Sequence, residues 1–371
     1  MSSPASQTQK IGRLTPFKDV LARLADEVSL VAGRAAAPAD AVGRALAADV
    51  VAKTDYPAKA IALRDGYAVR ADDTADASSY APAPLANVKA VQVGDAMPAR
   101  ADAVTPPEGV MDAGGIAAVA SVAGGDGVLA AGADAQAGKP LRSAGHRLRQ
   151  IDVAVLQALD VKSVSLHVPR VRVVAARAAD AFLETIVGFT ERFVVASGGE
   201  IVANSSRDLR AALSEDGADF IIIVGGSGMG ERDASITTLQ SVGHLHFHGI
   251  GIAPGETSAL GFISGLPVLI VPGRIDAAFA ALATIGDAVV ARLSGSNGES
   301  PVVSATLARK VVSTIGLVEI VPVELQDAQA TPLASGYLPM QAMLRADGYI
   351  VVPAQSEGYP AGSVVAVRAM P

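Results

Sequence analysis

Five consecutive apolar residues, Phe220 to Val224, are followed directly by a turn rich in glycine, which runs from Gly225 to Gly230. The apolar run is β-branched and aromatic, and it is too short to span a membrane, so it is typical of a strand covered on both faces. N–H groups of glycine can approach a phosphate or another anion closely because no Cβ stands beside them. The pattern therefore predicts a buried strand that ends in an anion-binding turn, with a plain tight turn as the alternative.

The segments around this run alternate between strand and helix patterns. Strands are expected at 171–175, 220–224 and 267–271, and helices at 178–190, 206–215 and 276–293. Such alternation is typical of a parallel sheet with helices on its faces. Ligands of these sheets bind beyond the carboxyl ends of the strands, which is where the glycine turn would lie.

The flanking regions have other patterns. Thr15 is expected to cap a helix with Pro16 at its first position, and further helices are expected at 41–51 and 151–159. Short apolar pieces separated by Gly, Pro and Asp up to about residue 138 indicate a β-rich insertion. After residue 298 the chain reads as a small β domain without a convincing helix.

Composition excludes several classes of protein. The 371 residues carry 37 acidic and 30 basic side chains, so a broad surface for nucleic acid is not expected. Cysteine is absent, which excludes disulfides, thiolate metal sites and cysteine nucleophiles. The first ten residues lack the apolar core of a signal peptide, and the apolar stretches are interrupted by Gly and Pro. We expect a cytoplasmic protein without a membrane span.

Several motifs, taken in order, resemble those of the molybdopterin molybdenumtransferases, the family of bacterial MoeA and the gephyrin E domain. The most specific is Arg64-Asp-Gly-Tyr-Ala-Val-Arg70. The others are 45–50, Ala137-Gly-Lys-Pro140, Ala144-Gly145, the 225–233 turn, 253–262, Val271-Pro-Gly273, Ser335-Gly-Tyr-Leu338, 346–353 and 359–365. The resemblance covers residues 14 to 370.

The resemblance implies an α/β multidomain fold and an elongated homodimer. Its parts would be a split N-terminal helical domain (14–50 and 138–167), a β-rich lid insertion (51–137), a parallel α/β molybdopterin-binding domain (168–297) and a C-terminal β domain (298–371). Enzymes of this family take adenylylated molybdopterin and molybdate, cleave the adenylyl bond, and release molybdenum cofactor and AMP. Mg²⁺ would bridge the pyrophosphate.

The resemblance also indicates site residues. Asp65 and Asp233 correspond to acidic positions of the family site and are the candidates for catalysis and for holding the metal. A turn residue before Gly66 is the alternative for Asp65, and a helix N-cap is the alternative for Asp233. The candidates for cofactor binding are Gly225, Gly226, Ser227, Gly228, Pro272, Gly273, Arg274 and Ser335.

The chain departs from the family at charged positions. Where the family usually reads Lys-Pro-Gly-Lys-Pro, with both lysines near the ligand's phosphates and the molybdate, this chain has Ala253-Pro-Gly-Glu256-Thr257. The family's Ser-Thr-Gly-Asp-Glu is replaced by 175–180, and Pro-Gly-Asn-Pro reads Pro272-Gly-Arg-Ile275. Each lost charge-assisted contact is typically worth about 1.5–3 kcal/mol, which should weaken the binding of a polyanion.

Two arginines could restore the lost positive charge. Arg274 stands at the start of an expected helix and Arg232 lies in the glycine turn, so both could point toward the pocket; solvated surface arginines are the alternative.

Two further patterns have other interpretations. His244, His246 and His248 would share one face of an extended strand, which could bind zinc or nickel, although such histidines are more often partly exposed strand residues. Ser227 could be a nucleophile, but the sequence shows no histidine–acid pair to activate it.

The leading function is therefore molybdenum insertion in molybdenum cofactor biosynthesis. The alternatives are a non-catalytic carrier, which would deliver cofactor to a client molybdoenzyme, and a dimeric scaffold without a pterin ligand. Loss of the lysines favours the alternatives, whereas Asp65, Asp233 and the glycine turn favour a live pocket.

Overall fold

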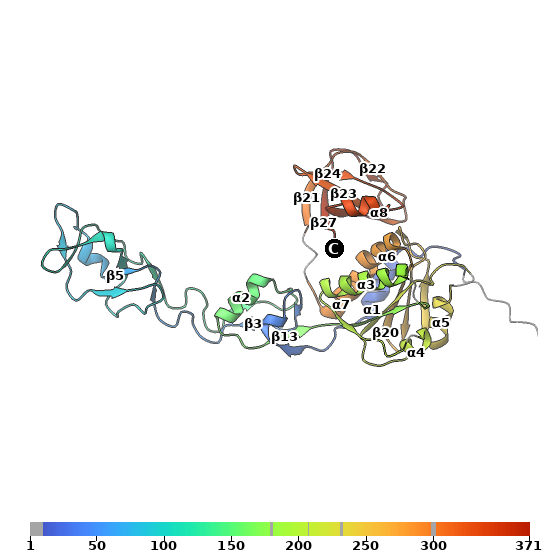
Figure 1. Ribbon diagram of the computed structural model, residues 1–371, viewed down its shortest axis with the longest axis horizontal. Coiled ribbons are helices and arrows are strands. Elements are labelled where there is room, and N and C mark those ends of the chain that lie inside the picture. Colours follow the sequence, from blue (N-terminus) through green and yellow to red (C-terminus); the bar gives the residue numbers. More distant parts are fainter. Residues whose placement is uncertain (1–9, 179–180, 207, 231–232, 298–301) are drawn as a thin grey trace, which may run out of the picture. The chain divides into compact units, whose positions relative to one another are not determined.

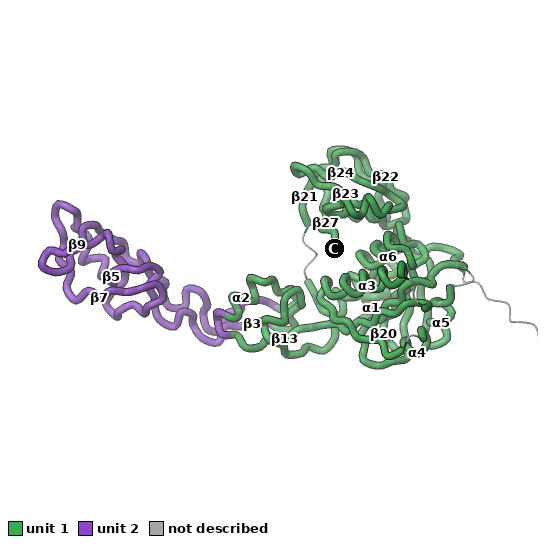
Figure 2. The backbone as a smooth tube through the Cα atoms, viewed as in Figure 1, with its two compact units in different colours: residues 1–48, 144–157, 161–371 green, residues 49–143, 158–160 purple. Residues whose placement is uncertain are grey.

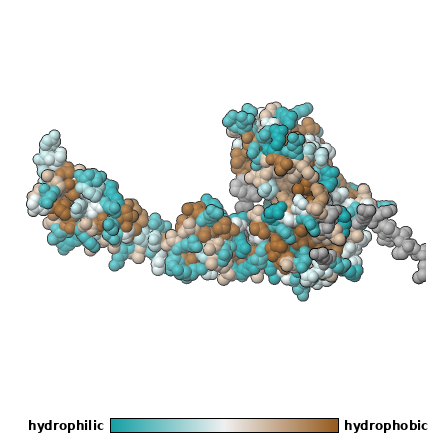
Figure 3. All heavy atoms as spheres, viewed as in Figure 1, coloured by the Kyte–Doolittle hydropathy of each residue, from teal (hydrophilic) through white to brown (hydrophobic). Residues whose placement is uncertain are grey.

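The computed structural model describes residues 10–178, 181–206, 208–230, 233–297 and 302–371, so the candidate Arg232 lies outside the described residues. The chain divides into two compact units (Figure 2). One comprises residues 49–143 and 158–160, and the other comprises the remainder. Each unit carries its own mixture of apolar and polar residues on its surface (Figure 3).

The larger unit contains the predicted α/β sheet. Its order is β15 (Glu200–Val202), β14 (Arg170–Ala175), β16 (Phe220–Val224), β20 (Leu266–Val271), β19 (Ala259–Ile263) and β17 (His244–His248). The first four strands are parallel, and the last two run antiparallel. All five residues of β16 are buried, as their β-branched and aromatic composition predicts.

Helices cover both faces of this sheet (Figure 1). One face packs on α3 (Ala181–Ala196), α6 (Ile275–Ala281), a π-helical turn (Leu282–Gly286), α7 (Asp287–Ser294) and α1 (Phe17–Glu27). The other face packs on α4 (Leu209–Leu213) and α5 (Ser235–Val242). The two apolar clusters explain why strands of this sheet are apolar on both sides.

The helix pair α6–α7 and its π turn form the one described stretch, Ile275–Ser294, that is long and apolar enough to cross a membrane. Its most apolar window is 78% buried within the protein. It packs against the sheet as a core helix.

A closed β domain follows the sheet. β21 (Val302–Leu307), β23 (Val318–Gln326), β24 (Gln329–Pro332), β25 (Gly348–Val352) and β27 (Val364–Ala369) pair in a ring, because β23 bonds to both β24 and β25. The short β18 (Ile252–Ala253), which comes from the α/β region, pairs in parallel with β23. A short antiparallel pair, β22 (Val311–Val312) and β26 (Gly358–Tyr359), completes the domain. The predicted α/β multidomain fold with a C-terminal β domain is therefore confirmed.

The structure corrects three local predictions. Residues 41–51 form no helix: Gly43 has φ +77°, and Ala45–Leu46 (β2) and Val50–Val51 (β3) pair with distant strands. Tertiary pairing thus overrides helix propensity there. Pro16 is itself the N-cap of α1 and no side chain caps it; the backbone N–H of Thr15 donates to the carbonyl of Gly249. The C-terminal domain also contains a helix, α8 (Met340–Arg345).

The remaining part of the larger unit is small. It contains α2 (Gln150–Ala158), which matches the predicted 151–159 helix, and a sheet in the order β1 (Arg34–Ala36), β13 (Val164–His167), β2. The 3-10 turn η1 (Pro38–Asp40) precedes β2. Helix α1 packs in the core of the α/β sheet, through Val20, Leu24 and Val28, and not on α2.

The smaller unit is built from short strands. Its sheets are β7-β5-β8, β6-β10-β9, β11-β4 and β12-β3, and every strand pair in them is antiparallel. The bounds not yet given are β4 (Ile61–Ala62), β5 (Gly66–Val69), η2 (Ala71–Thr74), β6 (Ala83–Pro84), β7 (Lys89–Val91), β8 (Ala103–Thr105), η3 (Pro107–Gly109), β9 (Val110–Asp112), β10 (Ile116–Ala118), β11 (Val128–Leu129) and β12 (Pro140–Arg142). The small core of this unit consists of Ala62, Ala68, Val91 and Val104.

Candidate functional site

The parallel strand order reverses between β14 and β16. From β14 the chain crosses to β15 on one side, and it then returns to β16 on the other side. Helices that leave such neighbouring strands diverge, and ligands of these sheets usually bind beyond the carboxyl ends at that point. Three strand ends meet there: the N–H of Ala176 donates to the carbonyl of Val224 (2.9 Å), and the N–H of Gly225 donates to the carbonyl of Val271 (2.8 Å).

The glycine turn requires glycine at its start. Gly225 and Gly226 have φ +88° and +67°, which is the left-handed region. A Cβ on Gly226 would lie 2.3 Å from Oγ of Ser235. Ser235, the first residue of α5, is fully buried and donates its hydroxyl to the carbonyl of Gly225 (2.9 Å). The turn is therefore fastened to the start of α5.

Ser227 lies in the floor of the turn and is 2% exposed. Its Oγ is 3.0 Å from Oγ1 of Thr257, and its carbonyl oxygen is 2.8 Å from Nε2 of His248. The histidine therefore contacts the backbone of Ser227 and not its hydroxyl, so the serine-nucleophile hypothesis gains no base here. The Thr257 contact does bring the glycine turn beside the segment where the family's lysines would stand.

Asp233 closes the turn. Its Oδ2 accepts from the N–H of Gly230 (3.0 Å), and its own N–H donates to the carbonyl of Gly230 (3.0 Å). The N-cap of α5 is Ala234, without a side-chain cap, so the N-cap alternative for Asp233 is wrong. The described residues give Oδ1 of Asp233 no hydrogen-bond partner, which leaves this oxygen for a ligand.

The two lysine positions of the family are filled differently. Ala253 is 4% exposed and pairs with Glu319 of β23. Glu256 folds back so that its Oε2 accepts from the N–H of Gly255 (3.0 Å). The segment therefore lies beside the glycine turn but offers it a hydroxyl and a carboxylate in place of two ammonium groups.

Arg274 follows Pro272 and Gly273 at the end of β20, and its side chain is 63% exposed. Its Nε and Nη2 donate to the two oxygens of Asp276 (3.2 and 3.1 Å). Its guanidinium carbon lies 4.9 Å from the ring centre of Tyr337. The hydrogen bond to the Asp276 carboxylate, and then its charge, raise the pKa of Arg274. Arg274 is thus held by two partners while most of its side chain is exposed, so the structure is compatible with the alternative of a solvated surface arginine, and its contact with a ligand stays a prediction.

The other predicted cofactor-binding residues divide between two places. Gly273 lies against the glycine turn, since a Cβ built on it would be 3.5 Å from Cα of Gly225. Ser335 lies in the C-terminal domain, where its carbonyl accepts from the N–H of Tyr337 (2.8 Å). It borders a cavity of about 240 Å³ together with Arg309 and Lys310.

Asp65 belongs to the smaller unit. Its Oδ1 accepts from the N–H of Val93 (2.9 Å), which fixes the turn before Gly66. A Cβ on Gly66 would lie 2.2 Å from the carbonyl oxygen of Thr105, which explains the glycine there. The turn role is therefore present in the structure, and a meeting of Asp65 with Asp233 stays a prediction.

The three histidines of β17 do not share one face. A bulge between Leu245 and Phe247 shifts the register, so the residues on either side of it face opposite apolar clusters. The ring of His246 accepts from Nε of Arg23 (2.9 Å), whereas His248 reaches Ser227. Among the described residues no three His, Asp or Glu side chains are grouped to hold a metal.

Sequence reasoning missed three residues of this region. Asp276 was signalled only by its position two residues after Arg274 at a helix start. Ser235 and Tyr337 carried weaker signals: a small hydroxyl residue at the start of α5 and an aromatic residue within the Ser335–Leu338 motif.

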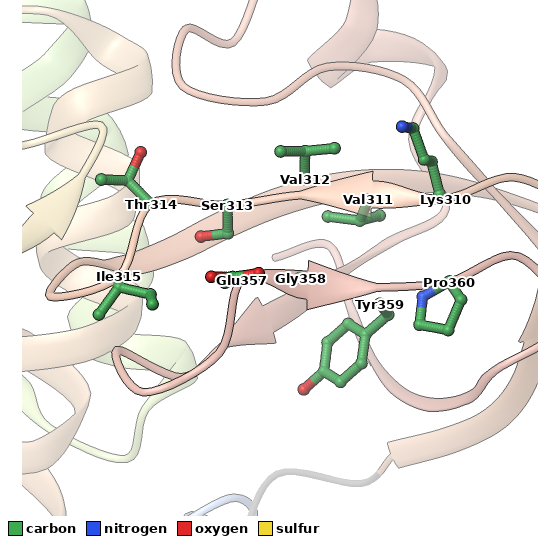
Figure 4. A pocket seen from close by; sticks show the side chains of 10 residues that line it. All are labelled: Lys310, Val311, Val312, Ser313, Thr314, Ile315, Glu357, Gly358, Tyr359 and Pro360. Carbon is green, nitrogen blue, oxygen red and sulfur yellow. The ribbon is translucent and has the colours of Figure 1, made fainter.

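A separate pocket of about 790 Å³ lies in the C-terminal domain at residues 310–315 and 357–360 (Figure 4). Lys310, Val312 and Thr314 point to one side of β22, and Ser313 points to the other. None of the predicted site residues is among its lining residues.

Comparisons with known proteins agree with this architecture. Residues 15–159 match the MoeA N-terminal region (domains I and II), 173–310 match a probable molybdopterin binding domain, and 304–369 match the MoeA C-terminal region (domain IV). The chain belongs to the MoeA family. Membership places the chain in molybdenum cofactor biosynthesis, and the strand ends that meet at the glycine turn lie within the region that matches the probable molybdopterin binding domain.

Individual relatives span nearly the whole chain. A Methanocaldococcus jannaschii protein provisionally named for molybdopterin biosynthesis is 26% identical over 369 residues, covering 88% of this chain and 90% of its own length. The crystal structure of the molybdopterin biosynthesis MoeA protein from Pyrococcus horikoshii is 25% identical, with a TM-score of 0.76, and covers 96% of this chain and 100% of its own. A molybdenum cofactor biosynthesis protein from Pyrococcus furiosus shares the fold at 22% identity, with a TM-score of 0.61, 96% of this chain and 99% of its own.

The substitution Gly226→Ala tests how tightly the MoeA-family glycine turn is fastened to α5. A positive φ costs a residue with a Cβ roughly 1–3 kcal/mol, and the overlap with Ser235 adds to this. Gly217→Ala is the matched control, because Gly217 has φ +95° with no atom within 4 Å of its Cβ position. Urea unfolding should show a larger loss of stability for Gly226→Ala. Equal losses would contradict the fastening.

Stability should depend on pH through His246. Burial, and then the charge of Arg23, lower the pKa of His246. The unfolded chain therefore takes up a proton near pH 6.5 that the folded protein resists, and stability falls as the pH drops from about 6.5 through the lowered pKa. The slope cannot exceed about 1.4 kcal/mol per pH unit for one proton.

Urea unfolding between pH 7.5 and 5 should show a smaller decrease for His246→Gln than for the parent. An unchanged profile for His246→Gln would show that other groups cause the dependence.

Proposed function

We propose that the chain binds adenylylated molybdopterin at the carboxyl edge of its α/β sheet and inserts molybdenum from molybdate, with cleavage of the adenylyl bond and release of AMP. The observation that supports this most is the glycine turn at the reversal of strand order. Its first two residues, Gly225 and Gly226, have the positive φ that favours glycine, and the turn stands at the start of α5. That is a suitable place for the pyrophosphate of the substrate.

The remaining requirements of the reaction fall on a few side chains. Backbone N–H groups of the turn would bind the phosphate oxygens. Arg274 stands at the neighbouring strand end, where its charge would stabilise the leaving phosphate. Oδ1 of Asp233 is available to hold a cation beside the turn.

The described residues suit a Mg²⁺ site in which the substrate provides most of the ligands. Mg²⁺ is usually held by one or two carboxylates together with substrate phosphates and water, not by a full protein cage. Asp233 would supply one such carboxylate. Mg²⁺ would neutralise charge on the pyrophosphate, while Asp233 would also keep the turn closed through Gly230.

A second candidate function is a carrier that binds molybdopterin or molybdenum cofactor without turnover and delivers it to a client molybdoenzyme. The buried Ala253 and the carboxylate of Glu256 favour it, because the charges that would bind molybdate and stabilise a leaving phosphate are replaced. A homodimer and a cytoplasmic location are parts of both proposals.

The direct test is an AMP-release assay on the purified full chain with adenylylated molybdopterin, molybdate and Mg²⁺. Release that depends on molybdate is expected for the enzyme, and Asp233→Asn should reduce it at least about ten-fold, the lower end for loss of a charged contact. Asp327→Asn is the control, because Asp327 lies in an exposed turn of the C-terminal domain. Retention of ligand without AMP release would favour the carrier. If the protein neither retains the ligand nor releases AMP, the scaffold is the remaining function.

Glu256→Lys separates the two binding functions. Restoring a cation beside the turn should tighten binding of the anionic substrate by roughly ten-fold or more, since a charge-assisted contact is worth about 1.5–3 kcal/mol. Glu256→Gln removes the anion without adding a cation and should give a smaller gain in calorimetric titration. If AMP release appears only in Glu256→Lys, the parent protein is the carrier. An unchanged affinity in both variants would place residue 256 away from the ligand.

A further inference from the structure

Exposed aromatic side chains gather at one cavity of the larger unit. Aromatic residues make up only 4% of the chain. Phe182 is nevertheless 47% exposed and Tyr337 is 56% exposed, and both line a cavity of about 220 Å³ together with Met340, which is 54% exposed. Exposed apolar side chains that converge on a hollow are more often ligand contacts than scattered surface residues.

This cavity adjoins the glycine turn through two connections. Arg274 and Asp276 line it, and Gly273 lies against Gly225. On the other side, Leu183 follows Phe182 in α3, and its Cδ1 lies 3.3 Å from where a Cβ on Gly225 would be. A ligand with its phosphates on the turn would therefore have the cavity within reach of its next chemical group.

The lining has the chemistry of a ring-binding site. Aromatic faces and thioethers bind flat heterocycles by stacking. The guanidinium of Arg274 already lies over the ring of Tyr337, and the pair of hydrogen bonds to the buried Asp276 holds it there. Arg274 thus fixes the orientation of Tyr337 and adds a positive charge at the edge of the cavity.

We propose that Phe182, Tyr337 and Met340 form a subsite for one planar heterocycle of a phosphorylated ligand. Pockets for whole drug-sized ligands usually measure about 300–1,000 Å³, so this smaller cavity suits a single ring system. The inference rests on the proposed function for the position of the phosphates. It gives Arg274 a positioning role beside the ring, in addition to its charge.

Adenylylated molybdopterin offers two such rings, the adenine and the pterin. Both are planar and rich in nitrogen, and both are joined to the pyrophosphate. The shared chemistry is therefore a flat heterocycle on a phosphate, and binding measurements with separate fragments distinguish the two sources.

The test is calorimetric titration of the full chain with AMP, with 6-hydroxymethylpterin and with inorganic pyrophosphate, which has no ring. At least one ring-bearing probe should bind about ten-fold or more weakly to Tyr337→Leu and Phe182→Leu than to the parent, whereas pyrophosphate should bind equally. An effect confined to AMP assigns the adenine, and an effect confined to the pterin assigns the pterin ring. Tyr337→Phe retains the aromatic face and should bind as the parent does.

Tyr80→Leu is the control, because Tyr80 is 99% exposed and lies in the smaller unit. Parent affinities for both ring probes that survive Tyr337→Leu and Phe182→Leu would overturn the subsite, and so would a parent protein that binds neither ring probe. In either case the proposed function is tested separately, by pyrophosphate binding and by AMP release. The titrations of the parent protein need no variant, so they can contradict the proposal even if a variant fails to fold.

Discussion

The reversal of strand order between β14 and β16 is the constraint on which the rest of the structure depends. A parallel sheet must be crossed by helices, and here those helices leave to opposite faces. The position of a ligand site at these strand ends is therefore set by topology before any side chain is considered. Side chains then decide what the site accepts. Glycine at 225 and 226 leaves the backbone bare, and Ser235 and Asp233 hold that backbone in place.

Much of this was predictable because the signals were local. The β16 run and the glycine turn have strong backbone preferences, and each was placed within a residue or two. The helix expected at 41–51 failed because pairing with β12 and β13 lies far away in sequence. The histidine face failed for a related reason: a single extra residue in β17 reverses the side chains beyond it, and no property of His244 to His248 announces that bulge.

Individual contacts at the site were the least predictable part. Arg274 was recognised as a replacement for family positions, but its partners Asp276 and Tyr337 were not. Asp276 is 3% exposed, although an aspartate near a helix start is usually a surface residue. Tyr337 belongs to another domain, and only the folded chain brings its ring to Arg274. In this chain Arg274 places a positive charge at the end of β20, with an acid and an aromatic ring attached to it.

The pairing of β18 with β23 couples the C-terminal β domain to the glycine turn. Ile252 and Ala253 are bonded into the wall of the C-terminal barrel, and only four residues later Thr257 touches Ser227 under the glycine turn. A second tie joins Leu338 to Asp276 at the start of α6 (3.5 Å). A tilt of the C-terminal β domain would therefore be expected to move Thr257 and Ser227, because only a short backbone segment joins them to β18. The C-terminal β domain is bonded to the α/β region at these two places, so a truncation before residue 302 would remove the partners of β18 and of Asp276.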